Sequence, residues 1–202
     1  MTEQRITGVV LAGGASRRFG SDKLSASVAG STPLARAIAA LAELCTEVVI
    51  VLAPGDDRAI PAAGVPVRAV HDPERHGGPL VGLLAGLEAA LEPIVLLAGG
   101  DMPTMSGAVL RALVNALITA PDAEGALLVR RSDDQPLPAA LRNGAATQAA
   151  RRLIAEDERS LRALLGRLRL RRLPEADWRA LDPDAETLRD IDRPSDLPNP
   201  RT

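Results

Sequence analysis

Short apolar runs alternate with longer amphipathic segments over the first 120 residues of the chain. The apolar runs are rich in Val, Ile and Leu and are bounded by Gly, Pro or polar residues, which is typical of buried β-strands. The segments between them carry helix signals, such as Thr32 before Pro33 at the first helical position. The pattern predicts strands at Val9–Ala12, Glu47–Ala53, Val65–Val70 and Ile94–Ala98, and helices at Thr32–Leu44, Pro79–Leu91 and Ser106–Ala120.

This alternation predicts parallel strands joined by right-handed crossovers, and so an α/β fold with a doubly wound, mostly parallel sheet. Beyond about residue 125 the pattern is less regular. We expect strands at Ala126–Arg130, Leu137–Leu141 and Leu168–Leu173, helices at Ala145–Glu156 and Ser160–Leu168, a weak strand at Thr187–Ile191 and a short terminal helix from Asp192. No repeat or long linker divides the 202 residues, which predicts a single domain.

The composition narrows the functional classes. A net charge of −2 gives no global attraction to nucleic acid or to a membrane surface, and no apolar run reaches the length of a membrane span. The single cysteine, Cys45, excludes an intramolecular disulfide and a cysteine-based zinc cluster, and we expect it to be a buried, inert thiol. The N-terminal residues lack an apolar leader, so the chain is predicted to be cytoplasmic.

The first predicted strand leads into a glycine-rich loop that carries three cations. Gly13 and Gly14 are followed by Arg17, Arg18 and Lys23, and Lys23 is the only lysine among 24 basic residues. Glycines let backbone N–H groups approach an anion and the cations neutralise it, so the loop predicts a polyphosphate site. The loop has neither Walker A nor G-x-G-x-x-G spacing. The competing interpretation is an arginine-rich surface turn.

Two aspartates follow predicted strands and are candidates for the same site. Asp101 comes after Ile94–Ala98 and two glycines, and Asp72 follows the third strand. Ligands of doubly wound sheets bind outside the carboxyl ends of the strands. Mg²⁺ takes one or two carboxylates plus phosphate oxygens, so Asp101 is the predicted metal ligand. The alternative interpretation of each aspartate is a helix-capping or turn residue. For the nearby His71 and His76 we favour a solvated or locally bonded histidine over a metal or acid–base role.

These residues resemble a known family. The run Leu11, Ala12, Gly13 and Gly14, together with Arg18, Gly20, Asp22 and Lys23, is similar to the N-terminal loop of the molybdenum cofactor guanylyltransferases, which belong to a wider group of nucleotidyltransferases with a Rossmann-like fold. The segment Gly100-Asp101-Met102-Pro103 resembles that family's metal-binding Asp-x-Pro segment. The run from Asp72 to Leu83 resembles its nucleotide-contacting segment.

The resemblance implies an enzyme that transfers GMP from GTP to a molybdopterin-type cofactor and releases pyrophosphate, with Mg²⁺ as cofactor. It implies Lys23, Arg18 and Asp101 as catalytic residues, Asp101 as metal ligand, and Leu11, Ala12, Gly13, Gly14, Lys23, Asp72 and Asp101 as nucleotide-binding residues. Residues 1–105 would bind the nucleotide and residues 125–202 the second substrate. In the second part, Glu158–Arg162 is similar to the family's second-substrate segment, and Gln135–Leu137 would line the pterin side. Acceptor molybdoenzymes or their chaperones would be further partners.

Several alternatives stay open. The family's asparagine at the end of the second strand is missing here, and Asp190–Leu197 also resembles the cytidylyl relatives, so CTP is the rival nucleotide. The run Leu11–Gly14, by contrast, favours the guanylyl branch. Another small phosphate is the rival acceptor. A nucleotide-binding module without turnover is the rival from another class, and it would not need Asp101. The eight arginines between Arg151 and Arg172 form either a solvated face or a cleft for the pterin phosphate.

Overall fold

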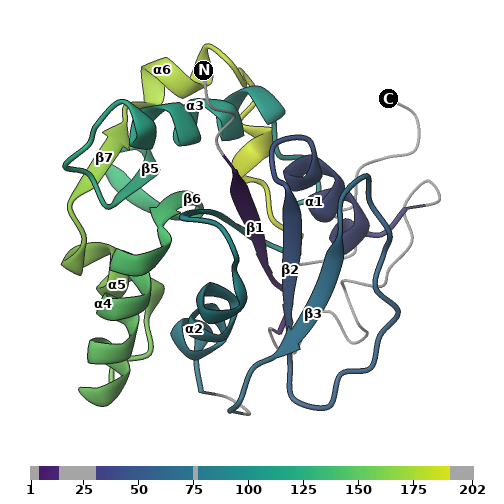
Figure 1. Ribbon diagram of the computed structural model, residues 1–202. Coiled ribbons are helices and arrows are strands. Elements are labelled where there is room, and N and C mark those ends of the chain that lie inside the picture. Colours follow the sequence, from purple (N-terminus) through teal and green to yellow (C-terminus); the bar gives the residue numbers. More distant parts are fainter. Residues whose placement is uncertain (1–4, 14–30, 75–76, 192–202) are drawn as a thin grey trace.

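A single seven-stranded sheet organises the protein. The computed structural model describes residues 5–13, 31–74 and 77–191. Within these residues the strand order is β3-β2-β1-β4-β6-β5-β7 (Figure 1). The strands are β1 (Ile6–Leu11), β2 (Glu47–Leu52), β3 (Val67–His71), β4 (Ile94–Gly99), β5 (Gly125–Arg130), β6 (Asp133–Arg142) and β7 (Leu170–Leu173). The predicted doubly wound α/β fold is therefore confirmed.

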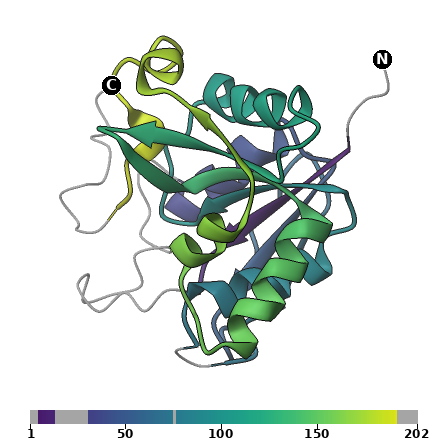
Figure 2. The same cartoon turned by 90° about the vertical axis from the view of Figure 1, so that its left-hand side faces the viewer.

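Helices cover both faces of the sheet (Figure 2). One core contains Val10 and the helices α1 (Pro33–Ala42), α3 (Gly107–Ile118) and α6 (Glu175–Arg179). The other contains Val9 and the helices α2 (Pro79–Ala89), α4 (Asn143–Ala155) and α5 (Leu161–Arg167). Successive residues of β1 thus point to opposite faces, as in any strand. Because both faces are covered, the central strand β4 is apolar and buried throughout rather than alternating, as the sequence pattern predicted.

The four strands of the first half run in parallel and end together. β1 pairs with β2 and with β4, and β2 pairs with β3, all in parallel. The register places Leu11 beside Gly99, and Leu52 beside His71. The carboxyl ends of β1 to β4 therefore lie along one edge of the sheet, which we call the carboxyl edge. The prediction that the residues following these strands share one rim is confirmed for those that the structure describes.

The antiparallel strand β6 lies between β4 and β5. It pairs with both of them in the opposite direction, whereas β7 returns parallel to β5. β6 begins at Asp133, four residues before the predicted start at Leu137, because it forms a hairpin with β5. The hairpin turn is made by Arg131 and Ser132, with φ of 49° and 70°. A two-residue turn with positive φ at both positions matches the twist of the flanking strands.

The prediction of a strand at Thr187–Ile191 is wrong. Residues Glu186–Leu188 form a 3₁₀ turn, η1, in which Thr187 is buried. The N–H of Thr187 donates to Asp182 Oδ2 over 2.7 Å, and its hydroxyl oxygen accepts from the N–H of Ser106 over 3.0 Å. A side chain held by these polar contacts has no need of a strand partner. The predicted terminal helix from Asp192 lies outside the described residues.

Local sequence signals fix several element ends. Thr32 caps α1 by accepting from the N–H of Ala35 over 3.1 Å, and Pro33 occupies the first helical position, as predicted.

Cys45 follows the end of α1 and is buried; its burial raises the pKa of the thiol to about 12. The buried, unreactive state expected for this cysteine is thereby supported. No helix among the described residues is long and apolar enough to cross a membrane.

Candidate functional site at the carboxyl edge

The backbone at the end of β1 is joined to both neighbouring strands. The N–H of Ala12 donates to Val51 O over 2.8 Å, and the N–H of Gly100 donates to Leu11 O over 3.0 Å. Leu11 is half-buried and Ala12 is buried, whereas Gly13, the next residue, is exposed. A Cβ at Gly13 would lie 3.2 Å from the backbone nitrogen of Ala53, closer than an ordinary contact. The exposed residue after β1 is thus a glycine without a side chain, which lets a ligand approach the backbone closely.

Asp101 stands beside this turn, at the end of β4. Its carboxylate folds back toward Gly99, where a Cβ would lie 2.5 Å from Asp101 Oδ1. Its carbonyl oxygen accepts from the N–H of Ile191 over 3.0 Å, and the following side chain, Met102, is buried. Asp101 itself is half-buried. The aspartate is therefore held by a buried residue on one side and by the segment after η1 on the other.

Asp72 occupies the same edge at the end of β3. Its N–H donates to Leu52 O over 2.8 Å, and its Oδ1 accepts from the N–H of Glu74 over 2.9 Å. Its Oδ2 lies 3.1 Å from where a Cβ on Gly82 of α2 would be. Both candidate carboxylates are thus accommodated in the same way, because each occupies space that a glycine leaves open.

The separation of the two aspartates defines the shape of a common ligand. β3 and β4 are three strand spacings apart, which is roughly 14 Å at about 4.8 Å per spacing. Gly13 lies between them, at the end of β1. A ligand that touches all three positions has to be elongated, as a nucleoside triphosphate is.

The cationic part of the predicted site lies outside the described residues. Arg18 and Lys23 lie outside the described residues, and so do Gly14 of the same loop and His76. The joint grip of Lys23 and Asp101 on one triphosphate therefore stays a prediction. His71 is described, and its Nε2 lies 3.1 Å from the carbonyl oxygen of Asp56, in line with the interpretation of a locally bonded histidine.

The fit of Mg²⁺ to this edge rests on donor chemistry. Among the described residues no group of three or more His, Cys, Asp or Glu side chains could enclose a metal ion. A protein site for Mg²⁺ does not require such a group, because the ion keeps water and substrate phosphates as ligands and takes one or two carboxylates. Asp101, a single carboxylate at the edge where the predicted polyphosphate loop follows β1, fits that description.

The segment Glu158–Arg162, which is predicted to serve the acceptor, reaches the same edge from the second half of the chain. Ser160 caps α5 by accepting from the N–H of Arg162 over 3.1 Å, and Arg162 Nη1 donates to Asp134 O in the β5–β6 hairpin over 3.3 Å. The carbonyl oxygen of Arg159 accepts from the N–H of Leu80, at the start of α2. The structure thus places Glu158–Arg162 between the hairpin and the segment that follows Asp72, a juxtaposition that the sequence did not reveal.

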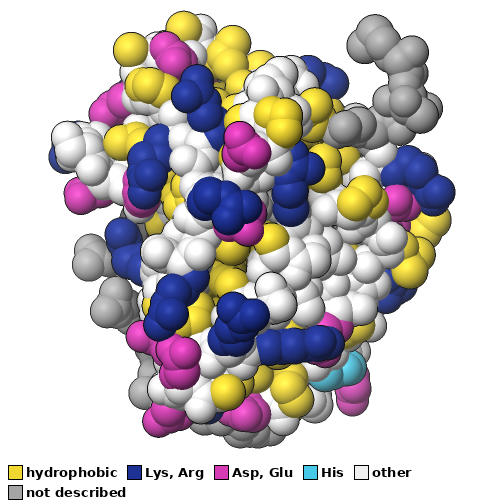
Figure 3. Space-filling view, turned by 60° about the vertical axis from the view of Figure 1, so that its left-hand side comes forward, with side chains coloured by type: hydrophobic (Ala, Val, Ile, Leu, Met, Phe, Trp, Pro, Cys, Tyr) yellow, Lys and Arg dark blue, Asp and Glu magenta, His cyan; other side chains and the backbone are white. Residues whose placement is uncertain are grey.

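The arginine-rich segment forms a face in which charges of both signs are mixed. Basic side chains are spread over this side of the molecule with acidic ones between them (Figure 3). Five ion pairs lie here, with nitrogen–oxygen distances of 2.9–3.2 Å: Arg151–Glu88, Arg159–Asp157, Arg167–Glu156, Arg169–Glu124 and Arg172–Asp134. Exposed pairs of this kind contribute little to stability. The arrangement favours the solvated face over the phosphate cleft.

A groove of about 900 Å³ lies between α2 and α4, and it contains none of the residues predicted to be catalytic or to bind the nucleotide or metal. Its lining includes Leu87, Asn143 and Arg151. Asn143 follows the end of β6, which is antiparallel to β4, so the groove lies toward the edge opposite Asp101. We therefore place the candidate site at the carboxyl edge, where the strand ends carry those candidate residues that the structure describes.

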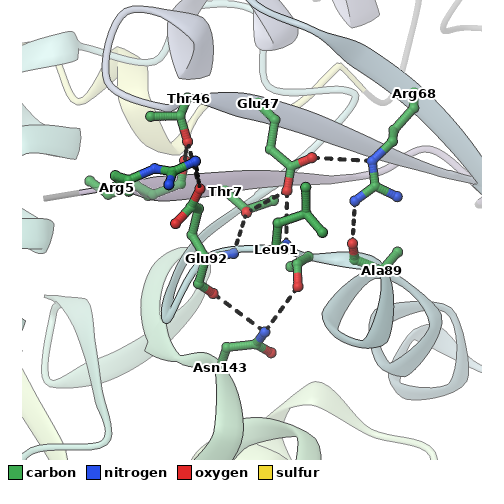
Figure 4. A network of polar contacts seen from close by, with 11 residues as sticks. Arg5, Thr7, Thr46, Glu47, Arg68, Ala89, Leu91, Glu92 and Asn143 are labelled. Carbon is green, nitrogen blue, oxygen red and sulfur yellow. Dashed lines mark hydrogen bonds and ion pairs between the residues drawn. The ribbon is translucent and has the colours of Figure 1, made fainter.

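The edge opposite the site is held by a buried polar network (Figure 4). Glu47 accepts from the hydroxyl of Thr7 over 2.7 Å and from the N–H of Leu91 over 2.9 Å, and it pairs with Arg68 over 3.1 Å. Burial alone would raise the pKa of Glu47, but these hydrogen bonds and the charge of Arg68 bring it below its usual value. The network ties the beginnings of β1, β2 and β3 to the end of α2 and so fixes the frame on which the carboxyl edge is built.

Comparison with known proteins decides the family. The family model for the MobA-like NTP transferase domain matches residues 8–173. The chain belongs to this family. A protein of Chloroflexus aggregans named "Probable molybdenum cofactor guanylyltransferase" is 34% identical over 195 residues, which cover 95% of this chain and 91% of the relative. As a member of the MobA-like NTP transferase family, the chain is a nucleotidyltransferase.

Solved structures support the fold of the MobA-like domain. A molybdopterin-guanine dinucleotide biosynthesis protein A from Archaeoglobus fulgidus is similar, with a TM-score of 0.75, 21% identity and coverage of 95% and 94% of the two chains. A 4-diphosphocytidyl-2C-methyl-D-erythritol synthase from Anaerococcus prevotii has a TM-score of 0.69, 13% identity and coverage of 96% and 93%. Because both kinds of enzyme share the architecture, the fold alone does not select the nucleotide or the acceptor.

Proposed function

We propose that this nucleotidyltransferase transfers GMP from GTP to the phosphate of the molybdenum cofactor, giving the guanine dinucleotide form and pyrophosphate. The observation that carries the proposal is the pairing of Leu11 with Gly99, which sets the end of β1 beside the end of β4, two residues before Asp101. The relative that is 34% identical bears the corresponding name, which supports the choice of GTP and of the cofactor. In this proposal, residues up to 105 hold the nucleotide and residues from 125 hold the acceptor.

The chemistry required of the protein is mainly positioning and charge neutralisation. In the proposed reaction an oxygen of the acceptor phosphate attacks the α-phosphorus in line, and the bond to the pyrophosphate leaving group breaks. Lys23 and Arg18 neutralise the triphosphate and the leaving pyrophosphate, Asp72 contacts the nucleotide, and Gly13 and Gly14 admit it close to the backbone. Mg²⁺ held by Asp101 would supply further neutralisation of charge on the phosphate oxygens. No covalent enzyme intermediate is needed.

Release of pyrophosphate from GTP and molybdopterin, in the presence of Mg²⁺, tests the proposal. We expect turnover by the wild type and a loss of at least 100-fold in kcat/KM for Asp101→Asn, which keeps the size of the side chain but removes its charge. Asp177→Asn, in an exposed residue of α6, is the matched control and should keep wild-type activity. Tight GTP binding that is independent of Mg²⁺, without any pyrophosphate release, would instead support a binding module.

A panel of GTP, CTP, ATP and UTP, each with Mg²⁺, tests the choice of nucleotide. A ligand that binds the folded state raises the unfolding temperature according to its affinity, so we expect the largest rise with GTP. The panel addresses a departure in the sequence, because β2 leads into Ala53-Pro54 where the family has an asparagine. A larger shift with CTP would reassign the nucleotide and leave the proposed roles of Asp101 and Lys23 intact.

A further inference from the structure

The start of α2 is held by a residue that lies 79 positions later in the chain. Gly78, the N-cap of α2, has no side chain to cap the helix. The N–H of Leu80 donates instead to the carbonyl oxygen of Arg159, over 3.1 Å. Free N–H groups at a helix start need partners, so this carbonyl takes the place of the missing cap.

The contact at Gly78 leaves no room for a side chain. Gly78 has a φ of 85°, and a Cβ there would lie 2.7 Å from Arg159 Cβ and 3.1 Å from Arg159 O. Gly55 has a similar φ of 75°, but nothing lies within 4 Å of where its Cβ would be. The two glycines therefore share a positive φ and differ in the contact.

Glu158 shapes the turn that presents the carbonyl of Arg159. Its Oε1 accepts from the N–H of Arg159 over 2.8 Å and from the N–H of Ser160 over 2.9 Å. The turn follows the end of α4 at Ala155 and includes Asp157, which has a φ of 64°. Arg159 Nη1 also donates to the carbonyl oxygen of Ile154 over 2.9 Å. A carboxylate that accepts two successive backbone N–H groups fixes the orientation of the peptide between them.

The contacts continue from α2 to the nucleotide-side aspartate. Gly82, two residues after Leu80, packs against Asp72, and the N–H of Gly77 donates to the carbonyl oxygen of Glu74 over 3.4 Å. A shift of the first turn of α2 therefore moves the surroundings of the Asp72 carboxylate.

We infer that Glu158 is a positioning residue for the nucleotide, acting through the Arg159 carbonyl and the first turn of α2 on Asp72. This inference rests on the proposed function, in which Asp72 contacts the nucleotide. The same turn continues into Ser160 and Arg162, so one short segment supports both the nucleotide side and the acceptor side of the edge.

Calorimetric titration of each variant with GTP and Mg²⁺, without acceptor, tests the inference. We expect Glu158→Ala and Gly78→Ala to raise the Kd for GTP about tenfold, corresponding to the loss of one or two hydrogen bonds. Glu158→Gln, whose amide oxygen still accepts from both N–H groups, should stay within about threefold of the wild type. Gly55→Ala likewise places an alanine at a positive φ but without the contact, and it should bind GTP as the wild type does.

The unfolding temperature of each variant separates positioning from a purely structural role, provided that titrations are done well below it. A lower unfolding temperature with an unchanged Kd in both Glu158→Ala and Gly78→Ala would overturn the inference. Equal weakening by Glu158→Gln and Glu158→Ala would also overturn it, because the effect would then follow the charge rather than the hydrogen bonds. A wild-type protein that binds no GTP would overturn the proposed function itself, and the inference with it.

Discussion

Replacing Gly99 by alanine tests whether the Asp101 carboxylate has to lie where it does. A Cβ at residue 99 would lie 2.5 Å from Asp101 Oδ1, whereas its next neighbours, Met102 Cγ and Sδ, lie at 3.4 Å. Ordinary contacts between heavy atoms begin at about 3.5 Å, so the carboxylate has to withdraw by about 1 Å while the methionine stays in place. The substitution therefore displaces the proposed metal ligand without altering its chemistry.

The expected loss is large in activity and small in stability. A misplacement of about 1 Å at a reacting centre can cost about 100-fold in rate. Alanine for glycine in a strand reduces the freedom of the unfolded chain, which favours folding by up to about 1 kcal/mol and offsets the local crowding. We therefore expect kcat/KM for GTP to fall about 100-fold, and the free energy of unfolding to stay within about 1 kcal/mol of the wild-type value.

Pyrophosphate release measured over a range of Mg²⁺ concentrations, together with urea unfolding, provides the assay. Gly64→Ala is the matched control, because Gly64 is exposed and no atom lies within 4 Å of where its Cβ would be. Adding Gly99→Ala to Asp101→Asn should cause little further loss, since both changes act on one carboxylate. A folded Gly99→Ala protein with wild-type kcat/KM and an unchanged Mg²⁺ requirement would refute the reasoning.

Three further predictions concern buried groups. The lowered pKa of Glu47 means that its stabilisation is complete above the unfolded-state pKa and is lost as the pH falls through the folded-state pKa. Glu47→Gln should therefore cost about 2 kcal/mol at pH 7 by urea unfolding, and the difference should shrink as the pH falls and disappear once the folded-state carboxylate is protonated. Burial raises the pKa of the Cys45 thiol to about 12, so Cys45 should resist a thiol reagent at pH 8 in the folded protein. In about 8 M urea, which unfolds most domains, the same thiol should react fully. Trp178, the single tryptophan of the sequence, is fully buried and donates from Nε1 to Val129 O over 2.9 Å, so its fluorescence should report unfolding. Trp178→Ala should cost about 3–5 kcal/mol in a urea titration followed by circular dichroism, because the variant has no tryptophan left to report.

The first half of the fold could be predicted because its elements are specified locally. Apolar runs such as Ile94–Ala98 are short and bounded by turn residues, and helix starts such as Thr32-Pro33 carry their own caps. Once parallel strands are inferred, their carboxyl ends follow, and so does the shared edge of Asp72 and Asp101. This part of the site needed no knowledge of long-range contacts.

The parts that were missed depend on partners far along the chain. The beginning of β6 carries Asp133, Asp134 and Pro136, which do not form an apolar run, and it is a strand only because it pairs with β5. Thr187 has the β-branched side chain of a strand residue, yet Asp182 and Ser106 hold it in a 3₁₀ turn. Neither set of partners is visible from the local pattern.

The site shows the same limit. That Arg159 supports the first turn of α2 depends on one carbonyl meeting one N–H across 79 residues, and no motif announces it. The spaces at Gly82 and Gly99 likewise become meaningful only when the opposing carboxylates are placed. Sequence reasoning therefore finds which side chains bear the chemistry more readily than it finds what keeps them in position.

The position of β6 bears on how the chain folds as it is synthesised. β4 is complete at Gly99, but its free side is covered only when Ala139–Arg142 pair with it, after β5 and its turn have been made. A nascent chain that has emerged only as far as β5 exposes a long apolar strand edge, which is a hazard for self-association. Splitting the gene between residues 105 and 125, the boundary of the two proposed parts, should thus give two fragments that are soluble only when they are expressed together.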